Sequence, residues 1–140
     1  MKTKTFTFYV KERAISKKII ESPREVYKRM KNLTKADQES FWVIAFNHSN
    51  KEIYHECLFI GGIAQVVVDP IIIFKRLFTI GASSFIVVHN HPGGNCIPSD
   101  NDKSTTDKIK DISKIVGIKL LDHIIISDDG YYSFSNSLSW

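Results

Sequence analysis

The sequence predicts one α/β domain, in which helices sandwich a mixed β-sheet. Three observations support this class. Short apolar runs typical of strands alternate along the chain with segments whose apolar residues recur at helical spacing. Some runs are separated only by turns and one pair by a helical segment, so hairpins and a β–helix–β passage share the sheet. The chain of 140 residues, 43% of them hydrophobic, can bury a single core.

Strands are expected where short apolar runs are bounded by turn-forming residues. Asn47-His48-Ser49-Asn50 has turn composition and joins two runs into a hairpin. Gly61-Gly62 ends the second of these runs, and Asp128-Asp129-Gly130 makes a closing hairpin. The expected strands are residues 6–10, 41–46, 53–60, 63–68, 84–88, 119–126 and 131–134.

Three helices are expected from their start and stop signals. Ser22 and Asp69 each precede a proline, which is typical of an N-cap followed by the first helical turn. These signals predict helices over residues 22–31 and 69–81, and a third is expected over residues 99–117, ended by a glycine. Apolar residues at helical spacing give the last two helices their buried faces: Ile73, Phe74, Leu77 and Ile80, then Ile109, Ile112 and Val116.

Composition and charge bear on whether the chain is a membrane protein, a secreted protein or a nucleic-acid-binding protein. No apolar stretch approaches the length of a membrane span and the mixed N-terminal sequence is unlike a signal peptide, so we expect a cytoplasmic protein. The net charge is +4, and positive charge is dense in an N-terminal arm at residues 1–20. This arm either contacts nucleic-acid phosphates weakly or is a solvated surface. Its basic residues are Lys2, Lys4, Lys11, Arg13, Lys17 and Lys18.

The strand at 84–88 leads directly into His89-Asn90-His91. Side chains two residues apart on a strand point to the same side, so the two imidazoles can share one metal ion while Asn90 points the other way. Asp102, from the next helix, can supply a third ligand. Two His and one carboxylate, with one position left for water, form the ligand set of a catalytic zinc site. Ser99-x-x-Asp102 is also nearly a capping box, and a rigid helix start can serve both purposes.

The pattern His89-Asn90-His91-Pro92-x-Gly94, followed by Pro98-Ser99-x-x-Asp102, resembles the JAMM motif of the JAB/MPN metallopeptidases, and its RadC branch most closely. The run Leu120-Leu121-Asp122-His123-Ile124-Ile125-Ile126 extends the resemblance, which covers residues 22–134. It implies a cytidine-deaminase-like architecture. It also implies that zinc is bound by His89, His91 and Asp102, and that Ser99 stabilises the oxyanion.

The resemblance further implies a catalytic base. The family uses a Glu just before an early strand to take a proton from the metal-bound water. Glu39, just before the strand at 41–46, matches that position, and Glu56 on the next strand is the alternative. RadC proteins often carry an N-terminal helix-hairpin-helix region, and we expect none in this sequence.

The remaining His and Cys residues receive smaller roles. His123 is interpreted as a core histidine with satisfied hydrogen bonds rather than a ligand, and His48 and His55 as surface residues. Cys96 is interpreted as an ordinary loop residue, with a fourth ligand or a redox-sensitive thiol as alternatives; a disulfide with Cys57 would need the fold to juxtapose them. A zinc deaminase is excluded because its His-x-Glu and Cys-x-x-Cys elements are absent.

The sequence therefore predicts a zinc-dependent hydrolase that cleaves a peptide or isopeptide bond of an unidentified protein substrate through a metal-activated water. The alternative is a non-catalytic accessory protein in DNA repair or mobile-element biology, with a structural metal and weak DNA binding. The intact ligand set and the candidate base favour the enzyme. Nothing in the sequence indicates the oligomeric state.

Overall fold

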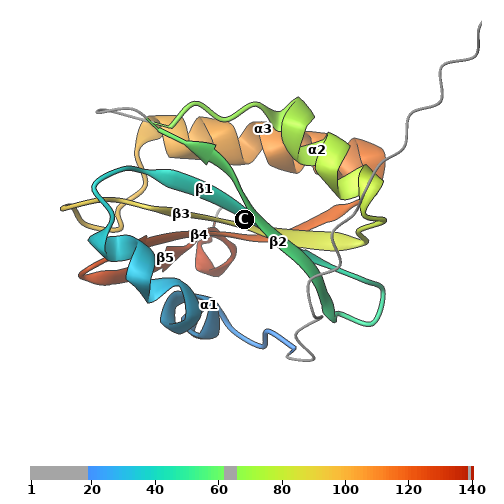
Figure 1. Cartoon of the computed structure of the whole chain (residues 1–140). Coiled ribbons are helices and arrows are strands. Elements are labelled where there is room, and N and C mark those ends of the chain that lie inside the picture. Colours follow the sequence, from blue (N-terminus) through green and yellow to red (C-terminus); the bar gives the residue numbers. More distant parts are fainter. Residues whose placement is uncertain (1–18, 62–65, 139) are drawn as a thin grey trace, which may run out of the picture.

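A mixed five-stranded sheet forms the centre of the molecule (Figure 1). The computed structural model describes residues 19–61, 66–138 and 140, and within them the strand order is β2-β1-β3-β4-β5. β1 is antiparallel to β2 and β3, β3 is parallel to β4, and β5 is antiparallel to β4. The strands are β1 (Ser40–Phe46), β2 (Glu52–Ile60), β3 (Ser84–Asn90), β4 (Lys119–Ser127) and β5 (Gly130–Ser133). The predicted fold class is confirmed.

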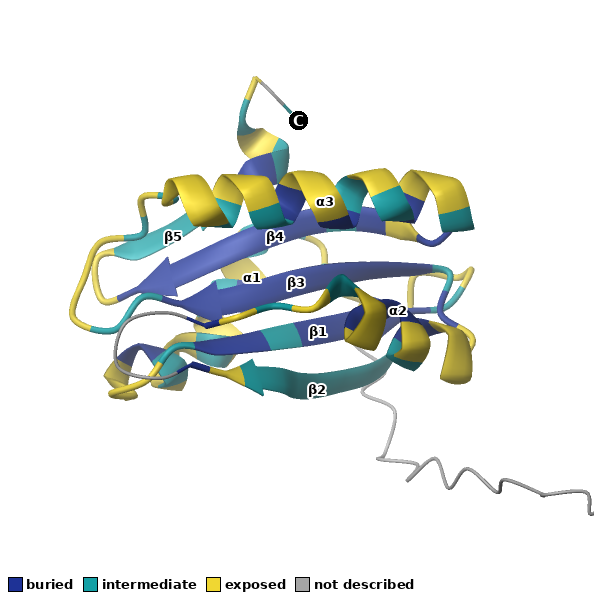
Figure 2. Ribbon diagram, turned by 90° about the horizontal axis from the view of Figure 1, so that it is seen from above, coloured by how far each residue is buried: buried dark blue, intermediate teal, exposed yellow. Residues whose placement is uncertain are grey.

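Helices cover both faces of this sheet. α2 (Pro70–Thr79) and α3 (Asp100–Val116) lie on one face and α1 (Pro23–Met30) lies on the other (Figures 1 and 2). α1 continues into a 3₁₀ turn, η1 (Lys31–Lys35), and β5 into another, η2 (Phe134–Asn136). Because α3 connects the parallel strands β3 and β4, its first turn lies near the end of β3. No helix in the described ranges is long and apolar enough to cross a membrane.

Side chains of the sheet alternate between two apolar cores. On β3, Phe85 and Val87 belong to the core under α2 and α3, whereas Ile86 and Val88 belong to the core under α1. β3 is buried along its whole length, and Figure 2 shows it in dark blue. Because of this alternation, neighbouring side chains at the end of β3 point to opposite faces of the sheet.

The helices begin and end close to where they were expected. Asp69 caps α2 by accepting from the Ile71 N–H over 2.9 Å, and α3 ends at Gly117 in the left-handed conformation, with φ of 74°. Ser22 occupies the N-cap of α1, but its side chain makes no capping hydrogen bond. The closing hairpin is confirmed as β4 and β5, although β5 ends one residue before Phe134.

One expected strand is wrong in the part that the structure describes. Residues 66–69 form no regular element, and the Val66 N–H donates to the Glu39 carboxylate over 2.9 Å. An N–H committed to a side chain is not available to a strand ladder. Residues 62–65, the strand expected at 6–10 and the basic residues of the N-terminal arm lie outside the described residues.

Candidate metal centre

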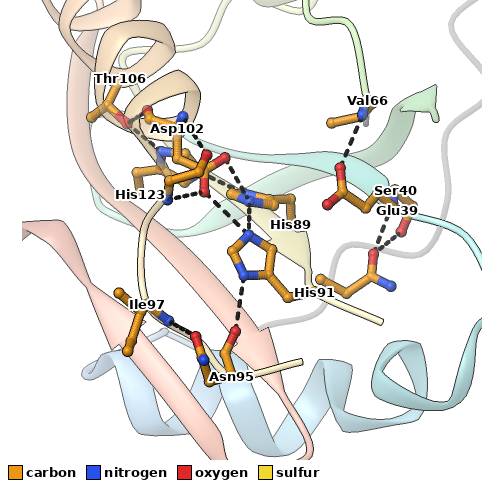
Figure 3. Close-up of polar contacts among 12 residues, drawn as sticks. Glu39, Ser40, Val66, His89, His91, Asn95, Ile97, Asp102, Thr106 and His123 are labelled. Carbon is orange, nitrogen blue, oxygen red and sulfur yellow. Dashed lines mark hydrogen bonds and ion pairs between the residues drawn. The ribbon is translucent and has the colours of Figure 1, made fainter. Parts of the chain in front are cut away.

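The end of β3 and the first turn of α3 bring three ligand-type side chains together. His89 lies in β3 and is paired with Phe41 of β1. His91 follows the strand, and its N–H donates to the Ile126 carbonyl of β4 over 2.9 Å, which keeps the backbone beside that strand. Asp102 lies in the first turn of α3. Figure 3 shows the three side chains directed at one another.

The ligand atoms of these residues form a compact triangle. His89 Nε2 lies 3.0 Å from His91 Nε2, and Asp102 places one carboxylate oxygen 3.1 Å from each of these nitrogens. Ligands that surround a tetrahedral zinc ion at about 2.0–2.1 Å lie about 3.3 Å from one another, so the triangle suits a single ion. The side chains of His89, His91 and Asp102 are 2%, 16% and 12% exposed. The three residues lie together and form a group that could hold a metal ion.

Each histidine is also held through its other ring nitrogen. His91 Nδ1 lies 2.9 Å from the Asn95 carbonyl oxygen, which can only accept, so the neutral ring carries its proton on Nδ1. His89 Nδ1 lies 2.8 Å from His123 Nε2. Partners of this kind orient a metal-binding imidazole and decide which nitrogen is left for the ion.

The helix start itself aims Asp102. Ser99 is the N-cap of α3: its Oγ accepts from the Asp102 N–H over 3.1 Å, and its own N–H donates to Asp102 Oδ2 over 2.8 Å. The capping box predicted from Ser99-x-x-Asp102 is therefore complete. The capping interpretation and the ligand interpretation agree, because the bond from the Ser99 N–H turns the carboxylate toward the two histidines.

Asp102 and His91 stabilise each other's charged forms. Partial burial opposes ionisation of Asp102, but the close contacts of its carboxylate with His89 and His91 outweigh burial and hold the pKa of this carboxyl far below its usual range. The hydrogen bond to Asp102 is in turn the largest cause of the raised pKa of His91. An ionised carboxylate facing two imidazole nitrogens is a donor set suited to a divalent transition metal such as zinc.

Glu39 lies just before β1, on the face of the sheet that carries the histidines. Phe41, two residues on, pairs with His89 and stacks on its ring. The Glu39 carboxylate accepts from the Val66 N–H, and Figure 3 shows it apart from the three converging ligands. The charge of Glu39 contributes to the raised pKa of His91, so Glu39 lies near the centre without belonging to the ligand triangle.

Glu56, the alternative base, is engaged by other groups. It lies on the edge strand β2, where Arg76 of α2 forms an ion pair with it at 2.7 Å. The Tyr54 hydroxyl donates to it over 2.6 Å. These contacts tie Glu56 to α2 and to its own strand.

Asn90 faces away from the metal side, as expected. Its buried side chain accepts from the Ser40 N–H over 2.7 Å and donates to the Leu33 and Gln38 carbonyls, each over 3.0 Å. Gln38 and Ser40 are the two neighbours of Glu39 in sequence. The residue between the histidines thus holds the backbone on both sides of the candidate base, a connection that no local pattern in the sequence indicates.

His123 is a buried histidine with partners on both ring nitrogens, as expected: His89 on one side and Thr106 on the other. Burial lowers its pKa well below the usual value. Sequence reasoning missed Thr106. The available signal was its place one helical turn after Asp102 on the predicted third helix, which puts both side chains on one helix face.

The expectations for the other histidines and for the cysteines have different outcomes. His48 is exposed, but His55 is not simply a surface residue: its side chain is 34% exposed and its Nδ1 lies 2.8 Å from the buried Glu52 carboxylate. Cys57 and Cys96 are free thiols. Cys96 does not belong to the group of converging ligands found among the described residues.

Comparisons with known proteins identify a family. Residues 20–139 match the RadC-like JAB domain. A UPF0758 protein of Flavobacterium johnsoniae is 47% identical over 69% of this chain and 42% of its own length. UPF0758 proteins of Photorhabdus laumondii and Staphylococcus carnosus are 40% and 41% identical, over 84% and 75% of this chain and 51% and 45% of their own lengths. The chain spans about half the length of these curated relatives. It belongs to the family of RadC-like JAB domains.

Proposed function

We propose that this domain is a zinc-dependent hydrolase. The observation that carries the proposal is the convergence of His89 Nε2, His91 Nε2 and the Asp102 carboxylate within 3.1 Å of one another. Structural zinc sites are almost always closed by four protein ligands, whereas catalytic sites have three and leave the fourth position for water or substrate. Three converging ligands in the described part of the chain therefore favour a catalytic centre.

When bound, a zinc ion polarises a carbonyl oxygen and lowers the pKa of water toward neutrality. The surrounding residues supply the remaining steps. Glu39 takes a proton from the attacking water and returns it to the leaving amine. The Val66 N–H holds Oε2 of this carboxylate in place, so Oε1 is the oxygen that takes the proton. The Ser99 hydroxyl, which accepts in the capping box, keeps its own proton to donate to the developing oxyanion.

A hollow beside these residues offers room for part of a substrate. The hollow lies beside Val66, whose N–H donates to Glu39, and beside Asn101, the residue before Asp102 in sequence. Its lining combines the exposed apolar side chain of Val67 with amide, hydroxyl and ammonium groups, which suits a peptide chain. A peptide or isopeptide bond is also the class that the JAB/MPN resemblance implies. The lining residues are Val66, Val67, Val68, Pro70, Asn101, Thr105 and Lys108.

Metal content tests the centre first. Protein purified without chelator is expected to carry about one zinc per chain by elemental analysis, the count of a single site. His89→Ala and Asp102→Ala are expected to lose most of it. His48→Ala, in the exposed turn between β1 and β2, is the matched control and should keep its zinc. Full zinc content in both ligand variants would end the assignment.

Hydrolysis is tested separately. Zinc-loaded protein is mixed with a fluorogenic peptide library and with isopeptide-linked conjugates, with and without chelator. We expect cleavage in one of the two classes, lost with chelator and in Asp102→Ala. Stoichiometric zinc without any turnover in either class would contradict the hydrolase and leave only metal binding.

A further inference from the structure

We propose that His123 and Thr106 are positioning residues that decide which nitrogen of His89 carries the proton, and so keep the Nε2 lone pair of His89 directed at the metal. The inference rests on the proposed metal centre and deepens it. Neither residue belongs to the converging ligands. They act through the line of hydrogen bonds that Figure 3 shows between Asp102, Thr106, His123 and His89.

The protons along this line can be assigned because one member can only accept. Thr106 Oγ1 lies 2.6 Å from the Asp102 carbonyl oxygen and 2.6 Å from His123 Nδ1. A carbonyl has no proton to give, so the single hydroxyl proton of Thr106 lies in the bond to Asp102. The Thr106 oxygen must then accept from His123, whose proton therefore lies on Nδ1.

The assignment continues to the metal side. A neutral His123 with its proton on Nδ1 presents a bare Nε2 to His89 Nδ1, which lies 2.8 Å away. His89 Nδ1 must carry a proton and donate it. The neutral His89 ring then has no proton on Nε2, the atom that faces His91 and Asp102. The backbone of one ligand, Asp102, thus selects the tautomer of another.

The surroundings of His123 support a neutral ring with fixed partners. The residue is 0% exposed and stacks on Phe134, with ring centroids 4.8 Å apart. Phe41 meets the ring edge-on at 5.7 Å. Charging an imidazole in such apolar packing is costly. Thr106 is 2% exposed, so solvent cannot easily take the place of its hydroxyl.

The opposite arrangement would disable the centre. If Thr106 donated to His123 Nδ1, His123 would carry its proton on Nε2 and donate to His89 Nδ1. The neutral His89 would then hold its proton on Nε2, inside the ligand triangle, where it blocks metal binding. The bond from the Thr106 hydroxyl to the Asp102 carbonyl opposes this state.

Two substitutions at Thr106 separate this role from packing. Valine keeps the shape of threonine without the hydroxyl, whereas serine keeps the hydroxyl and loses a methyl group. We expect Thr106→Val to weaken zinc binding about 10–100-fold, the usual effect of losing an outer partner of a ligand, and Thr106→Ser to lose much less. Affinity is measured by competition with a chromophoric chelator. Ser104→Ala, at an exposed position of α3, is the control for loss of a helix hydroxyl.

Ring-nitrogen NMR reads the tautomer directly. Long-range ¹⁵N–¹H spectra, recorded at about pH 8 so that free imidazoles are neutral, should place the His123 proton on Nδ1 in the wild type. In Thr106→Val it should move to Nε2. A purely structural loss would lower the melting temperature of the variant and leave the His123 tautomer unchanged.

The outcomes separate this inference from the proposed centre. A wild type that binds no zinc would remove the metal centre, and the NMR spectra of the zinc-free protein would still decide the tautomer. The inference is overturned if Thr106→Val binds zinc as tightly as the wild type, or if wild-type His123 carries its proton on Nε2. His123→Gln, whose amide can accept from His89 and donate to Thr106, should retain more zinc than His123→Leu.

Discussion

At the residue scale, Glu39 carries the sharpest test of the proposed chemistry. Glu39→Gln keeps an oxygen that can accept from the Val66 N–H, but an amide cannot take a proton from water. We expect the variant to keep its fold and its zinc and to lose hydrolysis roughly 10²–10⁴-fold, the usual contribution of a general base. Zinc content and kcat are measured on the same preparation.

Glu56→Gln is the matched control, because it removes the other candidate carboxylate from the next strand. Its kcat should stay near that of the wild type. Loss of zinc from Glu39→Gln would make Glu39 a ligand instead of a base. Unchanged kcat in that variant would move the role to Glu56 or elsewhere.

Glu52 gives a prediction about acid stability. Burial opposes its ionisation, but the hydrogen bonds and charge of Arg29, together with His55, outweigh burial and lower its pKa. A carboxyl whose folded pKa is lowered stabilises the fold above its unfolded value, about 4.3, and this contribution is lost as pH falls through the folded pKa. Glu52→Gln should therefore cost about 1.5–3 kcal/mol at pH 7.

Urea unfolding at neutral and acidic pH measures this contribution. The deficit of Glu52→Gln relative to the wild type should shrink in acid, where the wild type also loses the charge. Asp37→Asn, which removes an exposed carboxyl, is the control. A deficit that stays constant with pH would contradict the assignment of the stability to the ionised form.

The ligands could be predicted from sequence because each depends on local geometry. His89 and His91 follow from the two-residue period of a strand, and Asp102 from the start of a helix. The partners of Asn90 could not, because they depend on which turn meets the end of β3. For Thr106 the sequence indicates only a shared helix face with Asp102, and the contact of that face with His123 of β4 depends on packing. These contacts between elements are set by tertiary packing, which the local sequence does not indicate.

At the scale of elements, the start of α3 combines helix capping with ligand placement. Ser99→Ala removes the side-chain acceptor for the Asp102 N–H and should cost about 1 kcal/mol of stability. Ser99→Asn, which caps about as well as serine, should recover the stability. If the Ser99 hydroxyl also donates to the oxyanion, kcat should be lowered in both Ser99→Ala and Ser99→Asn. If Ser99→Asn instead has both the stability and the kcat of the wild type, the role of Ser99 is limited to capping.

The helices were predicted closely because their caps are local signals, whereas the run at 63–68 was misjudged. It is rich in Val, but a strand needs a partner as well as suitable side chains. In the described part of this run, Val66 donates to Glu39 and residues 66–69 join no ladder. The segment borders the candidate site instead of extending the sheet.

At the scale of the whole molecule, metal binding should be visible as stability. The three ligands come from β3, its following loop and α3, so a bound ion links segments that separate on unfolding. Zinc at 100 times its dissociation constant should add about 2.7 kcal/mol. Thermal unfolding with added zinc and with chelator measures the shift, and Asp102→Ala should show none. An equal shift in that variant would place the responsible ion elsewhere.

The α/β class was predictable from the alternation of strand-type and helix-type segments, but the strand order was not. The order places β1 between β2 and β3, and β4 beside β3. The hairpin turns indicate only which consecutive strands pair. The antiparallel pairing of β1 with β3 joins segments separated by β2 and α2, and no local residue pattern records it.

The opposite orientations of neighbouring side chains at the end of β3 have a consequence for misfolding. A pairing error of one residue would exchange the faces, sending the two imidazoles toward η1 and the Asn90 amide toward α3. The ligand group and the hydrogen bonds of Asn90 to the two neighbours of Glu39 would be lost together. A chain misaligned by one residue would therefore lack the group of three converging ligands, so the register of β3 and the metal centre depend on each other.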